Sequence, residues 1–361
     1  MSTTSFAPSS VDRLLVRRLS GASLRDRLPA LTNYLSRRST LPLGQRPEWL
    51  GVLQGSLQQQ AYALEAVQGD EVRGYLPLAF VSSLLFGRFL VSLPYLNSNG
   101  VVADDQATAR LLIDEAVRLA DELRVRHLEL RQEEAIDHPA LTGKMESKVH
   151  MRLALPDFVG PLWEGLKDKV RNQVRKGEKS GLTVHWGGVD MIDEFYSIFS
   201  QNMRDLGTPV YSRSLFHKAL EAFPGEAEFC IVRADGRPAA GALLLHGKGV
   251  TEVPSASCLR AFNPACANMM MYWNLLTRSV ERGQQVFDFG RCNRDGGSFK
   301  FKQQWGARPE PAVWQYYQRT GKPYSDMRPE SPRYQRLIRL WKRLPVAVTR
   351  MIGPAIVRGI P

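Results

Sequence analysis

The chain has 361 residues, which is more than one ordinary hydrophobic core accommodates, so two domains are expected. With 43% hydrophobic and 23% charged residues, its composition is that of a soluble globular protein. The four cysteines are too few for a disulfide framework, and neither they nor the six histidines have the spacing of zinc ligands. We therefore expect a reducing, cytoplasmic compartment and no structural metal.

Two segments within the first 95 residues have to be tested as a secretory signal or as a membrane span. Residues 1–12 are polar, lack the basic and apolar regions of a secretory signal, and are expected to be disordered. Residues 75–95 are apolar enough for a membrane span, but Arg88 near their centre would cost several kcal/mol in a bilayer. Two strands joined by a turn explain this segment better.

The pattern of residues 13–155 predicts a first α/β domain. Regularly spaced leucines and alanines predict a helix over 107–124, and a strand follows in the sequence "HLELR". The predicted strands are 13–18, 61–67, 76–84, 89–95 and 127–131.

Residues 156–322 repeat the same order of elements. Asp235 and Gly236 predict a hairpin turn, and Gly283 predicts the end of a helix. The predicted helices are 161–178, 189–205, 213–223 and 268–282, and the last strand is "VFDFG". The shared order suggests a duplicated fold.

This order, a helical start, an antiparallel hairpin and then strand–helix–strand, resembles the Gcn5-related N-acyltransferase (GNAT) fold. We therefore predict an α/β (α+β) protein with two tandem GNAT-like domains, mixed but mostly antiparallel sheets, and a basic helical tail at 323–361. In that fold the pyrophosphate of the acyl donor meets backbone amides at a helix N-terminus. Here Asn268 is the predicted N-cap, and Asn268 and Tyr272 are the candidate donor-binding residues, although the residues around Tyr272 also suit a core. The glycine-rich acetyl-CoA loop is missing, which weakens acetyl-CoA as the donor.

The helix over 161–178 has a wide basic face opposite an apolar stripe of leucines and valines. Arginine offers a forked pair of donors that suits phosphate, so this face could clamp a phosphate or diphosphate. A solvated surface helix is the alternative. The candidate phosphate-binding residues on this helix are Arg171, Asn172, Arg175 and Lys176.

Residues 298–302 alternate polar and aromatic side chains, which predicts a strand that points Lys300 and Lys302 to one side. An ammonium there could neutralise the oxyanion that forms when an acyl group moves to an amine. Asp288 could orient Lys302 or act as a base, or it could only accept backbone hydrogen bonds. Arg291 and Lys300 are candidate substrate-binding residues.

Two further features point to binding rather than to chemistry. Arg204 lies in the stretch 201–212, which could line an acceptor pocket or simply end a helix well. From Arg333 onward the chain has seven basic residues and no acid, mixed with apolar residues. Such a tail suits an anionic membrane surface, or it packs on the body as a helix with a solvated basic face.

Several motifs together resemble the FemAB family, specifically its branch associated with exosortase (PEP-CTERM) systems. They are "RPEWL", "LFGRFLVSLPY", "HLELR", "KVRNQVRKGEKSGL", "NMRDLGTPV", "ERGQQVFDFGR" and "GSFKFKQQWG". The resemblance implies two GNAT-like domains and transfer of an aminoacyl group to an amine of a nucleotide- or lipid-linked precursor. It also implies that Arg171, Arg175 and Lys176 serve the acceptor phosphates and that Lys302 serves the transfer step. The chain departs from the family at Cys292, where a serine is expected, and it has no long helical-hairpin arm.

The function expected from the sequence is an acyl- or aminoacyltransferase that forms an amide on a phosphate-linked envelope or exopolysaccharide precursor. It is expected in the cytoplasm, either free or as a peripheral protein of the inner membrane. The donor is aminoacyl-tRNA or an acyl thioester such as acyl-CoA, and no tightly bound cofactor is expected. The alternative is a non-catalytic basic module that binds nucleic acid or an anionic membrane.

Overall fold

The computed structural model describes residues 13–83, 86–294, 296–320 and 332–360. The predictions for residues 1–12 and for the tail between 323 and 331 lie outside this part of the chain.

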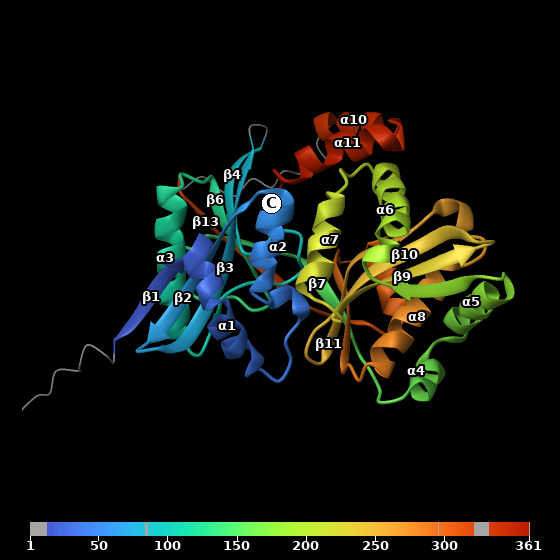
Figure 1. Ribbon diagram of the computed structural model, residues 1–361, viewed down its shortest axis with the longest axis horizontal. Helices are drawn as coiled ribbons and strands as arrows, with labels where there is room; N and C mark the ends of the chain where they lie inside the picture. The colour runs from blue at the N-terminus through green and yellow to red at the C-terminus, as the bar shows by residue number, and fades with distance from the viewer. Residues whose placement is uncertain (1–12, 84–85, 295, 321–331, 361) are drawn as a thin grey trace, which may run out of the picture.

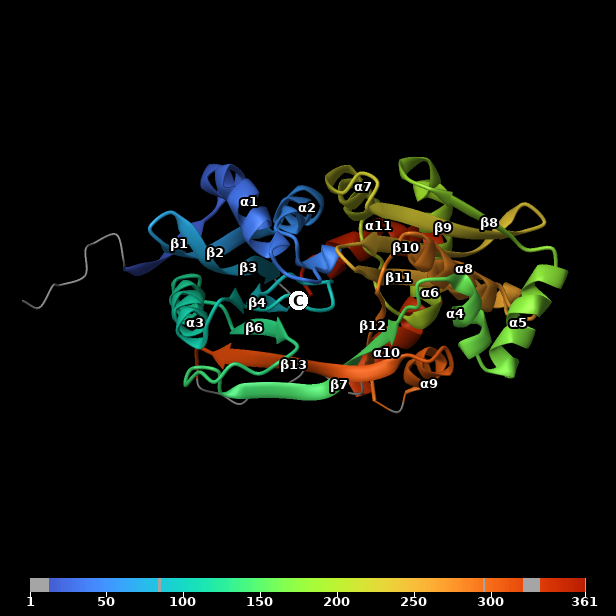
Figure 2. The ribbon, with the colours of Figure 1, turned by 90° about the horizontal axis from the view of Figure 1, so that it is seen from below.

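Strands from both halves of the chain join into one mixed sheet that runs through the molecule (Figures 1 and 2). Across the described residues the strand order is β1-β2-β3-β4-β6-β13-β7-β12-β11-β10-β9-β8, and β5 pairs with β3. The strands are β1 (Leu14–Leu19), β2 (Gln60–Gln68), β3 (Glu71–Ser83), β4 (Gly87–Val91), β5 (Val102–Ala103), β6 (His127–Gln132), β7 (Gly143–Ala154), β8 (Thr183–Gly187), β9 (Ala227–Ala234), β10 (Arg237–His246), β11 (Val250–Cys258), β12 (Val286–Asn293) and β13 (Arg308–Gln318).

Helices cover this sheet and join its two halves (Figure 1). They are α1 (Gly21–Ser36), α2 (Glu48–Leu57), α3 (Gln106–Glu122), α4 (Val159–Gly165), α5 (Asp168–Lys179), α6 (Ile192–Leu206), α7 (Arg213–Ala222), α8 (Ala267–Glu281), α9 (Gly297–Gln304), α10 (Pro332–Trp341) and α11 (Val346–Val357). Short 3-10 turns lie at η2 (Leu43–Gln45), η3 (Val189–Met191) and η4 (Arg260–Phe262). None of the described helices is long and apolar enough to cross a membrane.

The two halves repeat one arrangement, as the order of elements predicted. In the first half β4 and β6 are parallel neighbours connected through α3, and in the second half β11 and β12 are parallel neighbours connected through α8. Each parallel pair is hydrogen-bonded over only three positions and then diverges. Most other pairings are antiparallel, which confirms the predicted GNAT-like fold class with mixed, mostly antiparallel sheets.

The sequence analysis missed β7 and β13, and these two strands merge the halves. β13 comes late in the chain, yet it lies between β6 of the first half and β7 (Figure 2). Pro309 and Pro311 argue against a central strand, because proline has no N–H to donate. They are tolerated here because β13 pairs with β6 only from Val313 onward, so the segment that holds the prolines has one partner strand.

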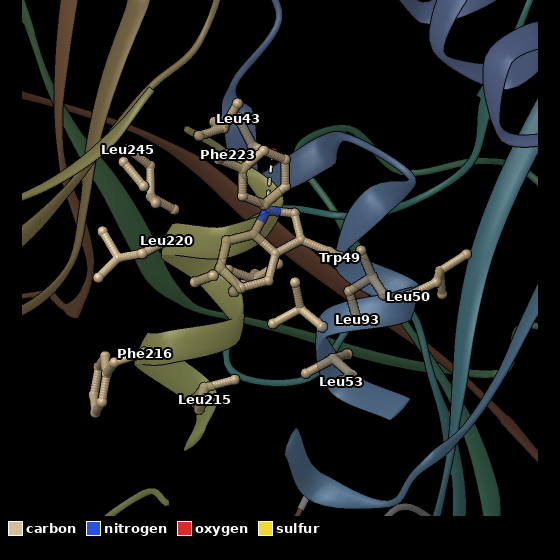
Figure 3. Close-up of a cluster of buried hydrophobic side chains, with 14 of the residues drawn as sticks. Leu43, Trp49, Leu50, Leu53, Leu93, Leu215, Phe216, Leu220, Phe223 and Leu245 are labelled. Atoms are coloured by element: carbon tan, nitrogen blue, oxygen red, sulfur yellow. Dashed lines mark hydrogen bonds between the residues drawn. The ribbon is translucent and has the colours of Figure 1, made fainter. Parts of the chain in front are cut away.

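A hydrophobic cluster between α2 and α7 fastens the first half to the second (Figure 3). Trp49 packs on Phe223 with ring centroids 5.3 Å apart, and its indole N–H donates to the carbonyl of Leu43 at 2.9 Å. Arg46 lies over the Phe223 ring and pairs with Glu226. The "RPEWL" motif is therefore part of the junction between the halves.

Three local predictions were wrong. Residues 298–302 lie in helix α9 rather than in a strand, because this segment packs as a two-turn helix against α8, β12 and β7. The helix predicted over 161–178 is broken at Leu166, whose backbone is extended, into α4 and α5. The N-cap of α8 is Cys266, in the left-handed region, rather than Asn268.

The basic tail forms two helices that pack on the body. α11 lies on α6, where Arg350 donates to the hydroxyl of Ser200 at 2.7 Å. Its end reaches the first half, where the Tyr95 hydroxyl donates to the carbonyl of Val357 at 3.0 Å. The tail thus bridges the two halves.

Candidate functional site

A row of charged and polar side chains crosses the sheet where the two halves meet. Opposite pairs in the strand registers join Arg131 on β6 to Trp314 on β13, and join β7 through β12 to β11. Trp314 itself lies opposite Met145 of β7, and the guanidinium of Arg291, which lies over the Trp314 ring, connects the two groups. Its members are Glu129 and Arg131 on β6, Trp314 on β13, His150 and Arg152 on β7, Asp288 and Arg291 on β12, and Glu252 on β11. All of them except Arg152 and Arg291 are buried. Such a concentration of buried charge is costly for stability and therefore indicates function.

Arg152 is fully paired within this row. Its guanidinium donates to Asp288 at 3.1 Å, to Glu310 at 2.7 Å and to both carboxylate oxygens of Glu133. Burial alone would lower the pKa of Arg152, but these carboxylates outweigh it and raise that pKa. The other oxygen of Asp288 accepts the N–H of Gly290 at 2.6 Å. Both oxygens of Asp288 are thus used to shape the chain, so Asp288 is a positioning residue here.

A bulge in β12 follows Asp288 and is held by Lys302. The pairing with β7 shifts between Asp288 and Arg291, and Gly290 has a φ of +77°. A side chain at Gly290 would also meet Asn97 at 3.1 Å, so both the backbone and the close approach require glycine. The buried Lys302 ammonium donates to the carbonyl of Gly290 at 2.9 Å and of Arg291 at 3.2 Å, and burial lowers its pKa. The bulge directs Arg291 back toward the first half.

Arg291 ends in a cationic and aromatic environment. Its guanidinium lies 3.8 Å from the ring centroid of Trp314, and the guanidinium of Arg131 lies 4.3 Å from the same centroid. Arg131 is neutralised by Glu129, to which it donates at 2.7 Å. Arg291, by contrast, has no hydrogen bond or ion pair to any side chain in the described part of the chain, and its Nη1 is buried without a partner. Burial, followed by repulsion from Arg131, lowers the pKa of Arg291 to about 9.

Two further buried groups complete the row. Glu252 accepts the backbone N–H of Gly44 at 2.7 Å, and burial and the nearby Asp288 raise its pKa to about 8. It is therefore largely protonated at neutral pH. His150 has no hydrogen-bond partner for either ring nitrogen among the described residues, and burial lowers its pKa, so it is neutral.

An open cleft in the first half leads to this row. Its volume is about 600 Å³, within the range of small-molecule sites, and it lies between the start of α3 and the end of β6. Ser98, Asp104, Gln132 and Glu133 are among its lining residues. Glu133 lines the cleft and also pairs with Arg152, so a molecule bound in the cleft would lie next to the row.

The structure brings three of the predicted site residues together, namely Asp288, Arg291 and Lys302. Lys300 is exposed, because helix α9 turns it away from the buried Lys302. Arg204 lies within α6, not in a loop, and it holds Asp205 and the carbonyl of Leu344 in the tail. These contacts give Arg204 a structural role that the sequence did not suggest.

The other predicted binding residues lie elsewhere. Arg171, Asn172, Arg175 and Lys176 are on α5, which packs on α8 at the outer edge of the second half (Figures 1 and 2). Asn268 lies in the first turn of α8. Tyr272 is buried against Phe289, Phe301 and Trp305. The apolar stripe predicted for the basic helix is confirmed, since its four members are buried in the core.

The sequence analysis did not single out Arg131, Glu129, Arg152, Glu252 or His150. A signal was present in "HLELR", because His127, Glu129 and Arg131 alternate with leucines and so share one face of a strand. A strand that is buried on both faces and yet carries three charged or polar groups predicts a functional or paired cluster.

Comparison with known proteins agrees with this geometry. Residues 166–303 match the family model described as "Acetyltransferase (GNAT) domain". This segment is similar to a GNAT domain. It includes β11, β12, α8, Asp288, Arg291 and Lys302, and the match indicates a transferase rather than a non-catalytic binding module.

Solved structures extend the likeness of fold to nearly the whole chain. FemX is 15% identical, with a TM-score of 0.64, and the match covers 91% of this chain and all of FemX. A domain described as that of a lysylphosphatidylglycerol synthetase from Agrobacterium fabrum is 13% identical, with a TM-score of 0.56 and coverages of 82% and 94%. A tandem GNAT protein from the clavulanic acid pathway is 13% identical, with a TM-score of 0.56 and coverages of 87% and 100%. A search of curated protein sequences found no match.

No group of side chains suited to hold a metal ion occurs in the described ranges of the chain. The tandem GNAT arrangement, with the polar row at the junction of its halves, is the frame in which the function is proposed below.

Proposed function

We propose that this protein transfers an acyl or aminoacyl group to a primary amine of a phosphate-linked precursor of the cell envelope or of an exopolysaccharide, in the cytoplasm. The observation that supports the acceptor class is the half-buried guanidinium of Arg291, whose buried Nη1 has no partner and which has no carboxylate of its own beside the neutralised Arg131. The match to the GNAT domain supports the transfer itself.

The unpaired guanidinium of Arg291 reduces the stability of the protein without a ligand. Burying a charge without a partner costs several kcal/mol, and native proteins pair such groups or use them for ligands. Arg291 cannot relieve this cost by losing its proton at neutral pH, because its pKa remains near 9. An anion bound at Arg291 would supply the missing charge. Arginine forks match phosphate oxygens well, and the Trp314 ring holds the guanidinium plane in place.

The transfer chemistry then needs three events near the bulge of β12. The amine nitrogen attacks the carbonyl carbon of the donor, a C–N bond forms, and the C–O bond of an ester or the C–S bond of a thioester breaks. The attacking amine gives one proton to ionised Glu252, whose pKa of about 8 suits proton exchange near neutral pH. That proton then passes to the leaving oxygen or sulfur, which departs as an alcohol or a thiol. Lys302 uses two of its three N–H groups on carbonyls and keeps one for the developing oxyanion.

The donor is proposed as aminoacyl-tRNA or an acyl thioester. Both FemX and the lysylphosphatidylglycerol synthetase domain share this fold at low identity. The exosortase-linked branch of the FemAB family remains part of the proposal, on the strength of the motifs given above. The basic face of α5 remains a predicted contact for phosphates of either substrate.

The test compares paired acceptors that differ only in the phosphate. A UDP-linked amino sugar and the free amino sugar are offered with aminoacyl-tRNA or with acyl-CoA, and the amide product is measured by mass spectrometry. The wild type is expected to prefer the phosphorylated acceptor by at least tenfold in kcat/KM. Arg291→Met should lose this preference mainly through a higher KM, whereas Arg260→Met, which removes an exposed arginine, should keep it.

Equal use of both acceptors by the wild type would contradict the phosphate-linked class while leaving the transferase in place. A binding measurement separates the two claims further. Pyrophosphate alone should raise the unfolding temperature of the wild type and of Arg260→Met, but not that of Arg291→Met.

A further inference from the structure

Helix α10 presents apolar side chains to solvent next to the end of α6. Leu337 is 54% exposed and Leu340 is 60% exposed, and they lie on the same side of α10 because they are three residues apart. α10 meets α6 at Gly207, where an added Cβ would come within 2.5 Å of Ile338. Ile338 faces Gly207, so Leu337 and Leu340 lie on the side of α10 that is turned away from α6. We call Leu337 and Leu340 the leucine patch.

Basic side chains surround the leucine patch. Arg336, Arg339 and Arg343 are exposed and form no ion pair with the described residues. Lys342 lies beside Gly207, with its Cε 2.9 Å from the position of an added Cβ. No Asp or Glu occurs in the sequence between 332 and 360. Among the residues that the structure describes, this surface is therefore apolar and its arginines have no carboxylate partner.

This combination decides what kind of partner fits. Exposed leucines lose free energy in water and regain it in an apolar medium, and cations beside them favour an anionic partner. A nucleic acid would satisfy the arginines through its phosphates but would leave the leucines in water. The interface of an anionic bilayer satisfies both, with leucines among the acyl chains and arginines at the headgroups.

We propose that the leucine patch and the surrounding arginines of α10 dock the protein on the surface of an anionic bilayer. The tail is fixed to both halves, since Arg204 holds the carbonyl of Leu344 at 3.0 Å and Tyr95 holds that of Val357. Docking through α10 therefore orients the whole molecule on the membrane and not only its tail. The docking is independent of the transfer reaction and holds whichever acceptor is used.

The test measures co-sedimentation of the full chain with vesicles of neutral phosphatidylcholine, alone or mixed with anionic phosphatidylglycerol. Binding is expected with the anionic vesicles, and it should weaken as salt rises from 50 to 500 mM because exposed charges are screened (about 10 Å Debye length at 0.1 M). Binding to neutral vesicles should be at least tenfold weaker.

Two variants with matched controls locate the surface. Leu337→Asn with Leu340→Asn should weaken vesicle binding about tenfold without changing the net charge. Its control is Leu15→Asn with Leu111→Asn, which changes exposed leucines of β1 and α3 in the first half and should bind as the wild type does.

Arg336→Gln, Arg339→Gln and Arg343→Gln together should weaken binding on the order of a hundredfold at low salt. The control for charge is Arg25→Gln, Arg237→Gln and Arg260→Gln, which removes three exposed arginines elsewhere. Circular dichroism and thermal unfolding confirm that each variant is folded. If the leucine variant fails to fold, the arginine variant and the salt series still test the proposal.

Three results would overturn the proposal. The first is no binding of the wild type to anionic vesicles, and the second is equal loss in a test variant and its control. The third is binding to tRNA in preference to the vesicles, with the leucine variant unchanged, which would assign the basic surface to nucleic acid.

Discussion

Two half-buried guanidiniums on neighbouring strands of the sheet have opposite surroundings. Arg152 on β7 donates to three carboxylates, those of Glu133, Asp288 and Glu310. Arg291 on β12 has an aromatic ring and another arginine as neighbours, but no carboxylate of its own. The first arrangement is complete without a ligand, whereas the second lacks its counter-charge.

A comparison of Arg152 with Arg291 shows how a charge with a structural role differs from one with a functional role in the same cluster. A saturated arginine contributes through its hydrogen bonds, and its loss leaves buried carboxylates unpaired. An unsaturated arginine reduces the stability of the free protein, and a protein keeps it when a ligand supplies the missing partner. Each prediction below tests or sharpens this distinction.

The largest expected effect is that of Arg152→Met compared with Arg291→Met. Arg152→Met should lower the free energy of unfolding by about 3–5 kcal/mol, because the buried carboxylate of Asp288 and the partly exposed one of Glu133 lose their partner. Arg291→Met should leave it unchanged or raise it by about 1–2 kcal/mol, because an unpaired charge is removed. Urea unfolding at pH 7.5 without ligand measures both. Equal destabilisation by the two substitutions would erase the distinction between the two arginines.

The substitution Glu252→Gln should change the free energy of unfolding by a comparable amount, and this change should depend on pH. Its pKa is about 8 in the folded protein and about 4.3 when unfolded, so between these values the folded state binds more protons. Stability should therefore fall as pH rises from about 4.5 to 8, and this fall should be smaller by roughly 3–5 kcal/mol in Glu252→Gln. The measurement is the urea midpoint of both proteins at pH 5, 7 and 9. Parallel curves would show that Glu252 is ionised like an exposed carboxylate.

Lys302 should show a moderate loss of stability together with a loss of transfer. Lys302→Met leaves the carbonyls of Gly290 and Arg291 unpaired, which costs about 1–3 kcal/mol, and it removes the cation proposed for the oxyanion. Lys300→Met is the matched control, since Lys300 is exposed on the same helix and should change neither stability nor turnover. A Lys302→Met protein with normal turnover would reduce Lys302 to a support for the bulge.

The smallest effect on stability is expected on α5. Arg171→Ala with Arg175→Ala removes one half-buried and one exposed side chain, the ion pair with Asp168 and the contact with the Trp163 ring, so the free energy of unfolding should fall by no more than about 1 kcal/mol. If α5 binds phosphates, the KM for donor or acceptor should rise while kcat changes little. An unchanged KM for both substrates would remove α5 from the binding surface.

Much of the fold follows from the sequence, because hairpins and amphipathic helices have local signals. The Asp235–Gly236 turn and the helix that ends before Gly283 lie where their residue types predicted them. The prediction of a strand over residues 298–302 was wrong because five alternating residues have the period of a strand. The packing of Phe301 on Tyr272, which favours the helix, cannot be seen in that local pattern.

The candidate site was predictable only in part. The second half supplied Asp288, Arg291 and Lys302 from one continuous stretch of sequence. Arg131 on β6 and Arg152 on β7 lie beside these three residues in the fold. They do so because β6 pairs with β13 and β7 pairs with β12, strands that are far apart in the chain. No local pattern specifies such a pairing, and the prolines of β13 argued against the strand that connects the halves.

The position of β13 also governs how the protein is made. β6 has no strand on its far side until the last residues of the second half have emerged from the ribosome, because its neighbour is β13. Until then the nascent first half exposes an unpaired strand edge, the kind of edge that recruits other chains. A fragment cut at residue 155 is therefore expected to aggregate rather than fold, and the tandem repeat, despite its two similar halves, should unfold as one cooperative unit.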